Sequence, residues 1–346
     1  MVAQLEHGSV AFDESGQITV DLLIVGAGPV GLFGAYYAGF RGLVTAVIDS
    51  LPEVGGQISA MYPEKLIHDV AGFPGVRGRD LVQALVAQSE PFSPTFLLGD
   101  QASRLQYDSN GDVLVDTQRG RTVRARAVVI TGGIGTFTPR PLPGGSEFEG
   151  YGLRYFVPRL DELADLDVVI VGGGDSAFDW ATSLEPIARS VTLVHRRQTF
   201  RAHAHTVKQV MDSRVEVLTD AWVNKIVGCT FRPTDGIEAV QITNSATGEV
   251  STRKAQAVVA ALGFKADLGP LMKWGLELSG RHIVVDSKMA TGRERIFAAG
   301  DITEYPGKVR LIAVGFGEVA TAVNNAATVL DPDAPLFPGH STDETV

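Results

Sequence analysis

Residues 21–31 of the chain, DLLIVGAGPVG, form a continuous apolar run that passes into three glycines with the spacing Gly-x-Gly-x-x-Gly. An uninterrupted apolar run predicts a strand that is buried on both faces of a parallel sheet. The glycines predict a turn into a dinucleotide-binding helix: Gly26 permits the turn, Gly28 lets backbone approach a pyrophosphate, and Gly31 allows close packing. A single motif of this kind can also serve packing alone.

The same pattern occurs a second time, at residues 167–177, where the sequence is DVVIVGGGDSA. Gly172 and Gly174 take the first two glycine positions, and Ala177 takes the third. Two copies in the same strand–turn–helix context argue against a role in packing alone. The sequence therefore predicts two dinucleotide sites, each with a pyrophosphate at the positive end of a helix.

The residue that follows the second strand of each copy distinguishes the two sites. In the first copy, the strand predicted over residues 44–48 leads to Asp49, an acid that can bind both hydroxyls of an adenosine ribose, as in FAD or NAD. In the second copy the equivalent position is His195, followed by Arg196 and Arg197. Arginine donates hydrogen bonds in a fork that matches a phosphate, so the second site is predicted to prefer NADPH. The alternative is a solvated turn that happens to carry two arginines.

Short apolar strands that end at glycines are predicted to complete each fold. Two of them lie at residues 127–133 (AVVITGG) and 257–263 (AVVAALG), and a third lies at residues 296–301 (IFAAGD). The last ends at Asp301, on the edge where open α/β sheets place their ligands. From the sequence alone, Asp301 is either a hydrogen-bond partner of a ribityl chain or the N-cap of the next helix.

The predicted fold class is α/β, with two nested Rossmann-like (three-layer ββα) dinucleotide-binding domains. Residues 1–136 and 264–346 are predicted to form a discontinuous FAD-binding domain, and residues 137–263 an inserted NADPH-binding domain. The linkers between them are expected at residues 138–145 and 264–269.

Composition excludes several classes of function. The 346 residues include 30 Lys and Arg against 40 Asp and Glu, and the net charge of −10 argues against a nucleic-acid partner. The apolar runs are too short to span a membrane, and no secretory signal is recognisable, so a cytoplasmic protein is expected. Cys229 is the only cysteine, which excludes an intrachain disulfide and a redox-active cysteine pair. No metal is expected, because His203 and His205 have no further ligand at a suitable spacing.

These residues closely resemble the ferredoxin–NADP+ reductases of the thioredoxin-reductase-like type. Thioredoxin reductases share the nested architecture, but their redox cysteine pair would fall close to residues 156–160, which here read FVPRL. The segments that carry the resemblance most specifically are residues 26–33 (GAGPVGLF), 55–65 (GGQISAMYPEK), 172–180 (GGGDSAFDW), 195–197 (HRR) and 315–318 (GFGE).

Together with the motifs, the resemblance implies a set of residues for each cofactor. Tyr62 is expected to stack on one face of the isoalloxazine, and His340 to cover the other face from the partner subunit of a homodimer. The residues expected to bind FAD are Gly26, Gly28, Pro29, Gly31, Asp49, Gln57, Tyr62, Ala102, Phe137, Asp301 and Thr342. The residues expected to bind NADPH are Gly172, Gly174, Asp175, Ser176, Ala177, His195, Arg196, Arg197 and Arg201.

The resemblance implies an enzyme in which the cofactors perform the chemistry. NADPH carries a hydride, a ferredoxin or flavodoxin takes one electron at a time, and a flavin can exchange the two. We therefore expect no catalytic side chain, and we expect Gly132, Gly133 and Gly263 to act as hinges for rotation of the NADPH domain. Two alternatives are an NADPH oxidase or quinone reductase that needs no protein partner, and a redox-sensing protein that binds NADPH and FAD.

Overall fold

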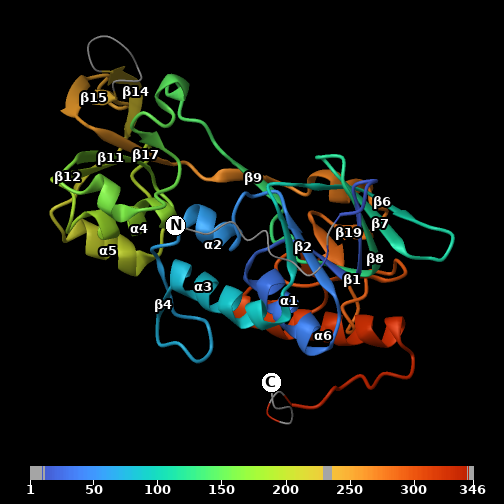
Figure 1. Cartoon of the computed structure of the whole chain (residues 1–346). Coiled ribbons are helices and arrows are strands. Elements are labelled where there is room, and N and C mark those ends of the chain that lie inside the picture. The colour runs from blue at the N-terminus through green and yellow to red at the C-terminus, as the bar shows by residue number, and fades with distance from the viewer. Residues whose placement is uncertain (1–9, 11, 229–235, 341, 343–346) are drawn as a thin grey trace. The chain divides into compact units, whose positions relative to one another are not determined.

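A computed structural model of the chain describes residues 10, 12–228, 236–340 and 342 and divides into two compact units (Figure 1). The first unit comes from separated stretches of the sequence, whereas most of the second is one continuous stretch. The first contains Met1–Ala60, Leu66–Thr136 and Ala266–Val346, and the second contains Met61–Lys65 and Phe137–Lys265.

A seven-stranded sheet forms the centre of the first unit. Its strands have the order β5-β2-β1-β8-β7-β6, and β21 pairs with β8 as well. β1 pairs in parallel with β2 and β8, whereas β7 runs antiparallel to β8. The strands are β1 (Gln17–Val25), β2 (Thr45–Asp49), β5 (Thr95–Leu98), β6 (Ala102–Tyr107), β7 (Val113–Thr117), β8 (Thr122–Ile130) and β21 (Ile296–Ala298).

The apolar run that predicted a buried strand is the end of β1. Leu22, Leu23 and Ile24 are fully buried, because β1 has a parallel neighbour on each side and helices above it. The helices of this unit are α1 (Pro29–Phe40), α2 (Gln57–Met61), α3 (Gly78–Ser89) and α6 (Ile312–Leu330). α1 packs against β1, β2, α3 and α6, and α6 also packs against β8.

Short ribbons complete the first unit. One is a hairpin of two strands, and the other is a sheet of three strands that precedes α6. They are β3 (Leu66–Ile67) and β4 (Val76–Arg77), and then β19 (Leu278–Ser279), β20 (His282–Val284) and β22 (Thr303–Glu304).

The second unit repeats the design with a smaller parallel sheet of order β10-β17-β11-β12-β13. One core cluster lies under α4 and α5, and a second lies under the antiparallel sheet β14-β15-β16. The elements are β10 (Leu153–Arg154), β11 (Asp167–Gly172), β12 (Ser190–Val194), β13 (Glu216–Leu218), β14 (Ala221–Gly228), β15 (Ile237–Asn244), β16 (Val250–Lys254), β17 (Ala257–Ala261), α4 (Asp175–Leu184) and α5 (Ala204–Met211).

The two predicted linkers are more regular than the sequence suggests. β9 (Thr136–Pro139) pairs with β18 (Phe264–Asp267) in a two-stranded ribbon. Gly133 and Gly263, which stand just before these strands, have φ of +58° and +78°, a conformation that glycine adopts without strain. In the part of the chain that the structure describes, no helix has the length and hydropathy of a membrane span.

Candidate functional site

The first glycine turn contains two glycines that have no room for a side chain and one that does. Gly26 has φ of +119°, and a Cβ there would lie 2.5 Å from the carbonyl oxygen of Thr131. A Cβ on Gly31 would lie only 1.8 Å from the carbonyl oxygen of Gly26. At Gly28, in contrast, a Cβ would meet nothing within 4 Å. Gly26 thus allows the chain that follows β8 to pass close to the turn, Gly31 allows α1 to pack on the turn, and Gly28 keeps a space open.

That space lies at the start of α1. Gly28 is the N-cap, Pro29 occupies the first turn, and no side chain caps the helix or places an acid in its first turn. The backbone N–H groups at a helix start have no partner inside the helix, and the helix dipole adds positive potential there. A phosphate group fits both features.

Asp49 stands at the end of β2, next to this turn. Its Oδ2 accepts a hydrogen bond from the backbone N–H of Ala27 at 2.7 Å, and its Oδ1 accepts one from Leu51 at 2.8 Å. Burial raises the pKa of the Asp49 carboxyl, and the two backbone N–H groups oppose that rise. Each carboxylate oxygen keeps further acceptor capacity, so Asp49 is oriented and can still accept hydrogen bonds from two hydroxyls.

Asp301 lies at the same edge of the sheet, because β21 pairs in register with the end of β8. Burial raises the pKa of its carboxyl, which makes no hydrogen bond to any residue that the structure describes. The N-cap alternative for Asp301 is wrong. β22 intervenes, and α6 begins only at Ile312 with Leu311 as its N-cap. The Asp301 carboxyl therefore keeps its full acceptor capacity at the sheet edge that carries the first glycine turn.

The other residues predicted for the first site have different surroundings. Ala102 is buried at the start of β6, and Gln57 begins α2 with its amide close to Gly133. Tyr62 and Phe137 fall into the second unit, where the ring of Phe137 contacts those of two other phenylalanines, Phe156 and Phe264.

His340 and Thr342 lie in the chain that follows α6, and both are exposed. The ring of His340 packs edge-on against Phe337, with 5.0 Å between the ring centroids. The structure therefore brings together the glycines, Asp49 and Asp301, while the assignment of Tyr62, Phe137, His340 and Thr342 to a flavin stays a prediction.

The second glycine turn repeats the geometry of the first. A Cβ on Gly172 would lie 2.5 Å from the carbonyl oxygen of Ala261 and 3.0 Å from the Cβ of Ala177. A Cβ on Gly174 would meet nothing within 4 Å. Gly174 is also the N-cap of α4, again without a side-chain cap. A second open space thus lies at the start of α4, where, unlike in α1, an acid, Asp175, stands in the first turn.

His195 packs against this turn. A Cβ on Gly173 would lie 2.2 Å from the imidazole ring, and the His195 Nε2 lies 3.2 Å from the carbonyl oxygen of Thr199. Burial lowers the pKa of His195, and the charges of Arg196 and Arg197 lower it further. At neutral pH the positive charge next to the second glycine turn therefore comes from Arg196 and Arg197.

Arg196, Arg197 and Arg201 are exposed, and none of them forms an ion pair with a described residue. The backbone N–H of Arg201 donates to the carbonyl oxygen of Gly173 at 2.8 Å, which ties this segment to the glycine turn. Three unpaired guanidinium groups near one helix start form a cationic site that suits a phosphate beyond the pyrophosphate.

Asp175 and Ser176 begin α4 and are exposed. The Oδ1 of Asp175 accepts a hydrogen bond from the backbone N–H of His203 at 2.8 Å, so this acid fixes the segment before α5. His203 caps α5 through a hydrogen bond from the backbone N–H of His205 to its Nδ1. The described residues contain no group of three or more side chains that could hold a metal ion.

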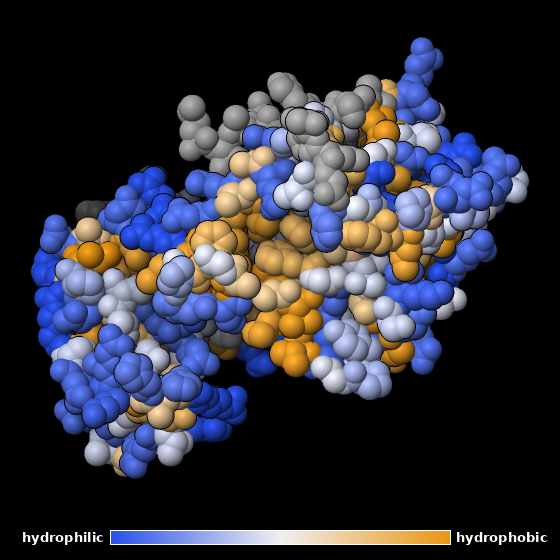
Figure 2. Space-filling model, turned by 90° about the horizontal axis from the view of Figure 1, so that it is seen from below, coloured by the Kyte–Doolittle hydropathy of each residue, from blue (hydrophilic) through white to orange (hydrophobic). Residues whose placement is uncertain are grey.

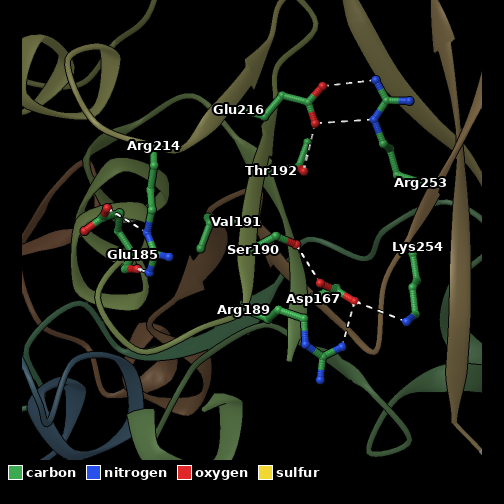
Figure 3. Close-up of a pocket in the computed structure, with 10 residues that line it drawn as sticks. All are labelled: Asp167, Glu185, Arg189, Ser190, Val191, Thr192, Arg214, Glu216, Arg253 and Lys254. Atoms are coloured by element: carbon green, nitrogen blue, oxygen red, sulfur yellow. Dashed lines mark hydrogen bonds and ion pairs between the residues drawn. The ribbon is translucent and has the colours of Figure 1, made fainter. Parts of the chain in front are cut away.

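A cavity of about 320 Å³ lies at the opposite ends of the same strands (Figure 3). Asp167, at the start of β11, forms ion pairs with Arg189 and Lys254. Two further pairs line the cavity, namely Arg253 with Glu216 and Arg214 with Glu185. All four cations there already have carboxylate partners, in contrast to the three arginines beside the glycine turn.

Comparison with known proteins gives one consistent result. The model of the pyridine nucleotide-disulphide oxidoreductase family matches residues 20–326. The ferredoxin–NADP reductase of Frankia alni is 64% identical over 324 residues, which cover 94% of this chain and 99% of that protein. The ferredoxin–NADP reductase of Halalkalibacterium halodurans is 46% identical, covering 93% of this chain and 97% of that protein.

Solved structures show the same fold. The thioredoxin reductase of T. acidophilum superposes with a TM-score of 0.72 and 25% identity, covering 90% of this chain and 98% of that one. The thioredoxin reductase of Lactococcus lactis gives a TM-score of 0.70 at 22% identity, covering 90% and 99%. The predicted fold class is confirmed.

The contrast between Gly172 and Gly174 predicts two separable defects. Gly172→Ala should lower the melting temperature, because its Cβ would press on backbone at Ala261, and overpacking costs about 1–3 kcal/mol. Gly174→Ala should keep the melting temperature but weaken dinucleotide binding, because its methyl group would enter the open space. Thermal unfolding without ligand and titration with the dinucleotide would separate the two. Equal melting temperatures for the two variants would contradict this division of roles.

Proposed function

Since this chain belongs to the ferredoxin–NADP reductases of the pyridine nucleotide-disulphide oxidoreductase family, we propose that it transfers electrons between NADPH and a ferredoxin or flavodoxin through bound FAD. The observation that carries this proposal is the pair of matching glycine turns with opposite neighbours. Asp49 accompanies the first turn, and unpaired arginines accompany the second. One chain thus offers a ribose-binding acid and a phosphate-binding cation site in two copies of one fold.

We assign FAD to the first unit and NADPH to the second. In the first, the open space at Gly28 would take the pyrophosphate, and Asp49 the adenosine ribose. Asp301 would accept a hydrogen bond from a ribityl hydroxyl, for which its desolvated and otherwise unbonded carboxyl is suited. In the second unit, Gly174 would face the pyrophosphate, and Arg196, Arg197 and Arg201 the 2′-phosphate.

Bound flavin would supply the exchange between a hydride and single electrons, so the protein needs no catalytic acid or nucleophile. Cys229 is the only cysteine of the chain, and a relay through a cysteine pair is therefore excluded. The side chains are left with three tasks: to bind, to orient and to exclude water. The cytoplasm is the proposed location, because a nicotinamide coenzyme is the proposed substrate.

Electron transfer to a protein carrier separates this function from its two alternatives. NADPH-dependent reduction of cytochrome c should be slow with the enzyme alone and should rise at least about tenfold when ferredoxin or flavodoxin is added. Equal rates with and without the carrier, together with fast reduction of oxygen or quinones, would favour an oxidase or quinone reductase. Negligible turnover with every acceptor would favour a redox sensor.

Coenzyme preference should depend on the arginines next to the second glycine turn. Changing Arg196 and Arg197 together to alanine should raise the KM for NADPH at least about tenfold, because each charge-assisted hydrogen bond contributes about 1.5–3 kcal/mol. The reaction with NADH and the FAD content should stay nearly unchanged, since NADH lacks the 2′-phosphate.

A matched control removes two charges from the other end of the same sheet. Arg189 and Arg253 line the cavity of Figure 3, and changing both to alanine alters the net charge equally. If this control raised the KM for NADPH as much as the first double variant, the effect would be general electrostatics and not recognition of the 2′-phosphate.

We further propose a homodimer in which His340 covers the flavin of the partner subunit. The chain after α6 carries two large exposed apolar side chains, Leu336 and Phe337, at 54% and 58% exposure. It is attached to its own unit by a hydrogen bond from the Arg41 guanidinium to the carbonyl oxygen of Pro335. Figure 2 also shows apolar side chains gathered on one face of the first unit. A second copy of the chain would cover such apolar surface.

Two truncations test the role of the tail. Deleting residues 339–346 removes His340 and Thr342, whereas deleting residues 343–346 keeps both. The longer deletion should change the flavin absorbance and turnover of the dimer, and the shorter one should not. The measurements are absorbance spectra, steady-state rates and sedimentation. An unchanged spectrum and rate after the longer deletion, or a monomeric full-length protein, would contradict the proposal.

A further inference from the structure

Glu318, the last residue of the GFGE segment in α6, is the centre of a buried polar network in the first unit. Its side chain is only 5% exposed. Its Oε2 accepts a hydrogen bond from the backbone N–H of Gly300 at 2.7 Å. Its Oε1 accepts one from the hydroxyl of Tyr305 and another from the ammonium of Lys308, each at 2.5 Å. Both carboxylate oxygens are thus engaged, which fixes the side chain in one position.

Lys308 is the unusual member of this network. It lies in the loop between β22 and α6, yet its side chain is 1% exposed, whereas the neighbouring Val309 is 53% exposed. Lysine is almost never fully buried unless it is paired, because its charge loses the stabilisation that water provides. The ammonium also lies 5.4 Å from the centre of the Tyr305 ring. Burial and the bond to Glu318 raise the pKa of Tyr305 to about 12, so its hydroxyl stays a donor.

The network contacts the proposed FAD site through Gly300, whose backbone N–H donates to Glu318. Gly300 precedes Asp301 and has φ of +83°. A Cβ on Gly315, in the first turn of α6, would lie 3.4 Å from the Cα of Gly300 and 2.5 Å from the side chain of Val30 on α1. The start of α6, the start of α1 and the turn at Gly300 are therefore packed without space between them.

Lys308 also acts on Asp301 through its charge. Burial raises the pKa of the Asp301 carboxyl, the positive charges of Lys308, Arg310 and His282 oppose that rise, and the negative charge of Glu318 adds to it. Arg310 is near the surface, where it forms an ion pair with Glu304 at 2.6 Å. Solvent therefore screens its charge, whereas the charge of the buried Lys308 is screened much less.

We propose that Lys308, Tyr305 and Glu318 are positioning residues that hold the Gly300–Asp301 turn in the geometry that binds the ribityl chain, and so determine how tightly the protein retains FAD. This inference rests on the assignment of FAD to the first unit. It gives the GFGE segment a specific role, since Glu318 connects α6 to the turn that carries Asp301. None of the three side chains needs to touch the cofactor.

The test compares buried and exposed members of one loop in the holoenzyme. The variants Lys308→Met, Glu318→Gln and Tyr305→Phe change the network, and Arg310→Met removes a charge from the same loop at the surface. The rate of FAD release, the flavin absorption spectrum and the flavin reduction potential are measured for each, together with the melting temperature of the apoprotein. We expect Lys308→Met and Glu318→Gln to release FAD at least about tenfold faster, with a shifted spectrum, and Arg310→Met to stay within about twofold.

Tyr305→Phe and Glu318→Gln keep the volume of the side chain and decide the question if Lys308→Met does not fold. The double variant Lys308→Met, Glu318→Gln should release FAD more slowly than the product of the two single effects predicts, because removing the second partner of a coupled pair loses less than removing the first. A lower melting temperature with unchanged FAD release, spectrum and potential in both isosteric variants would overturn the inference. If the wild-type protein bound no FAD, the cofactor assignment would be overturned as well. If the wild-type protein bound FAD normally and the variants released it at the wild-type rate, this inference alone would be overturned.

Discussion

Contact between a helix start and a strand end, with no side chain between them, is the constraint on which the rest of the molecule depends. In the first unit it requires Gly31 to lie against the carbonyl of Gly26, where even a methyl group would overlap with backbone. In the second unit the equivalent contact joins Gly172 to the first turn of α4, where a Cβ on Gly172 would lie 3.0 Å from the Cβ of Ala177. A Cβ on Gly28 or on Gly174, in contrast, would meet nothing within 4 Å, so each turn leaves an open space at the start of its helix. The same packing that builds each unit therefore leaves each unit with one anion site at the start of a helix.

Features that depend on local sequence could be predicted well. Uninterrupted apolar runs predicted the central strands, and the glycine spacing predicted the turns, because strand burial and close backbone approach at a turn both depend on a few consecutive residues. The positions of Asp49 and of Arg196 and Arg197 followed from the repeat, since equivalent positions in two copies of a fold lie at equivalent places. The family and fold class are confirmed, whereas the distribution of the cofactors between the units stays a prediction.

Features that depend on tertiary contact could not be predicted in the same way. The charge state of His195 depends on its packing against Gly173, which no spacing in the sequence indicates. The choice between two roles for Asp301 depended on where the next helix begins, and β22 delays that start to Ile312. Lys308 follows a Pro-Gly pair in a loop, a context that favours exposure, and its burial is explained by tertiary partners, the carboxylate of Glu318 and the ring of Tyr305.

The discontinuity of the first unit has a consequence for synthesis on the ribosome. β1, β2 and β8 emerge early and can pair with one another, but β21 completes the sheet only after the whole second unit has been made. Until then the end of β8 is an unpaired edge, and Asp301 does not yet exist. The second unit, which is nearly continuous, can complete its core first, although domains that fold during synthesis generally do so from the N-terminus. A nascent chain can therefore contain a folded second unit while the sheet of β1, β2 and β8 still lacks β21.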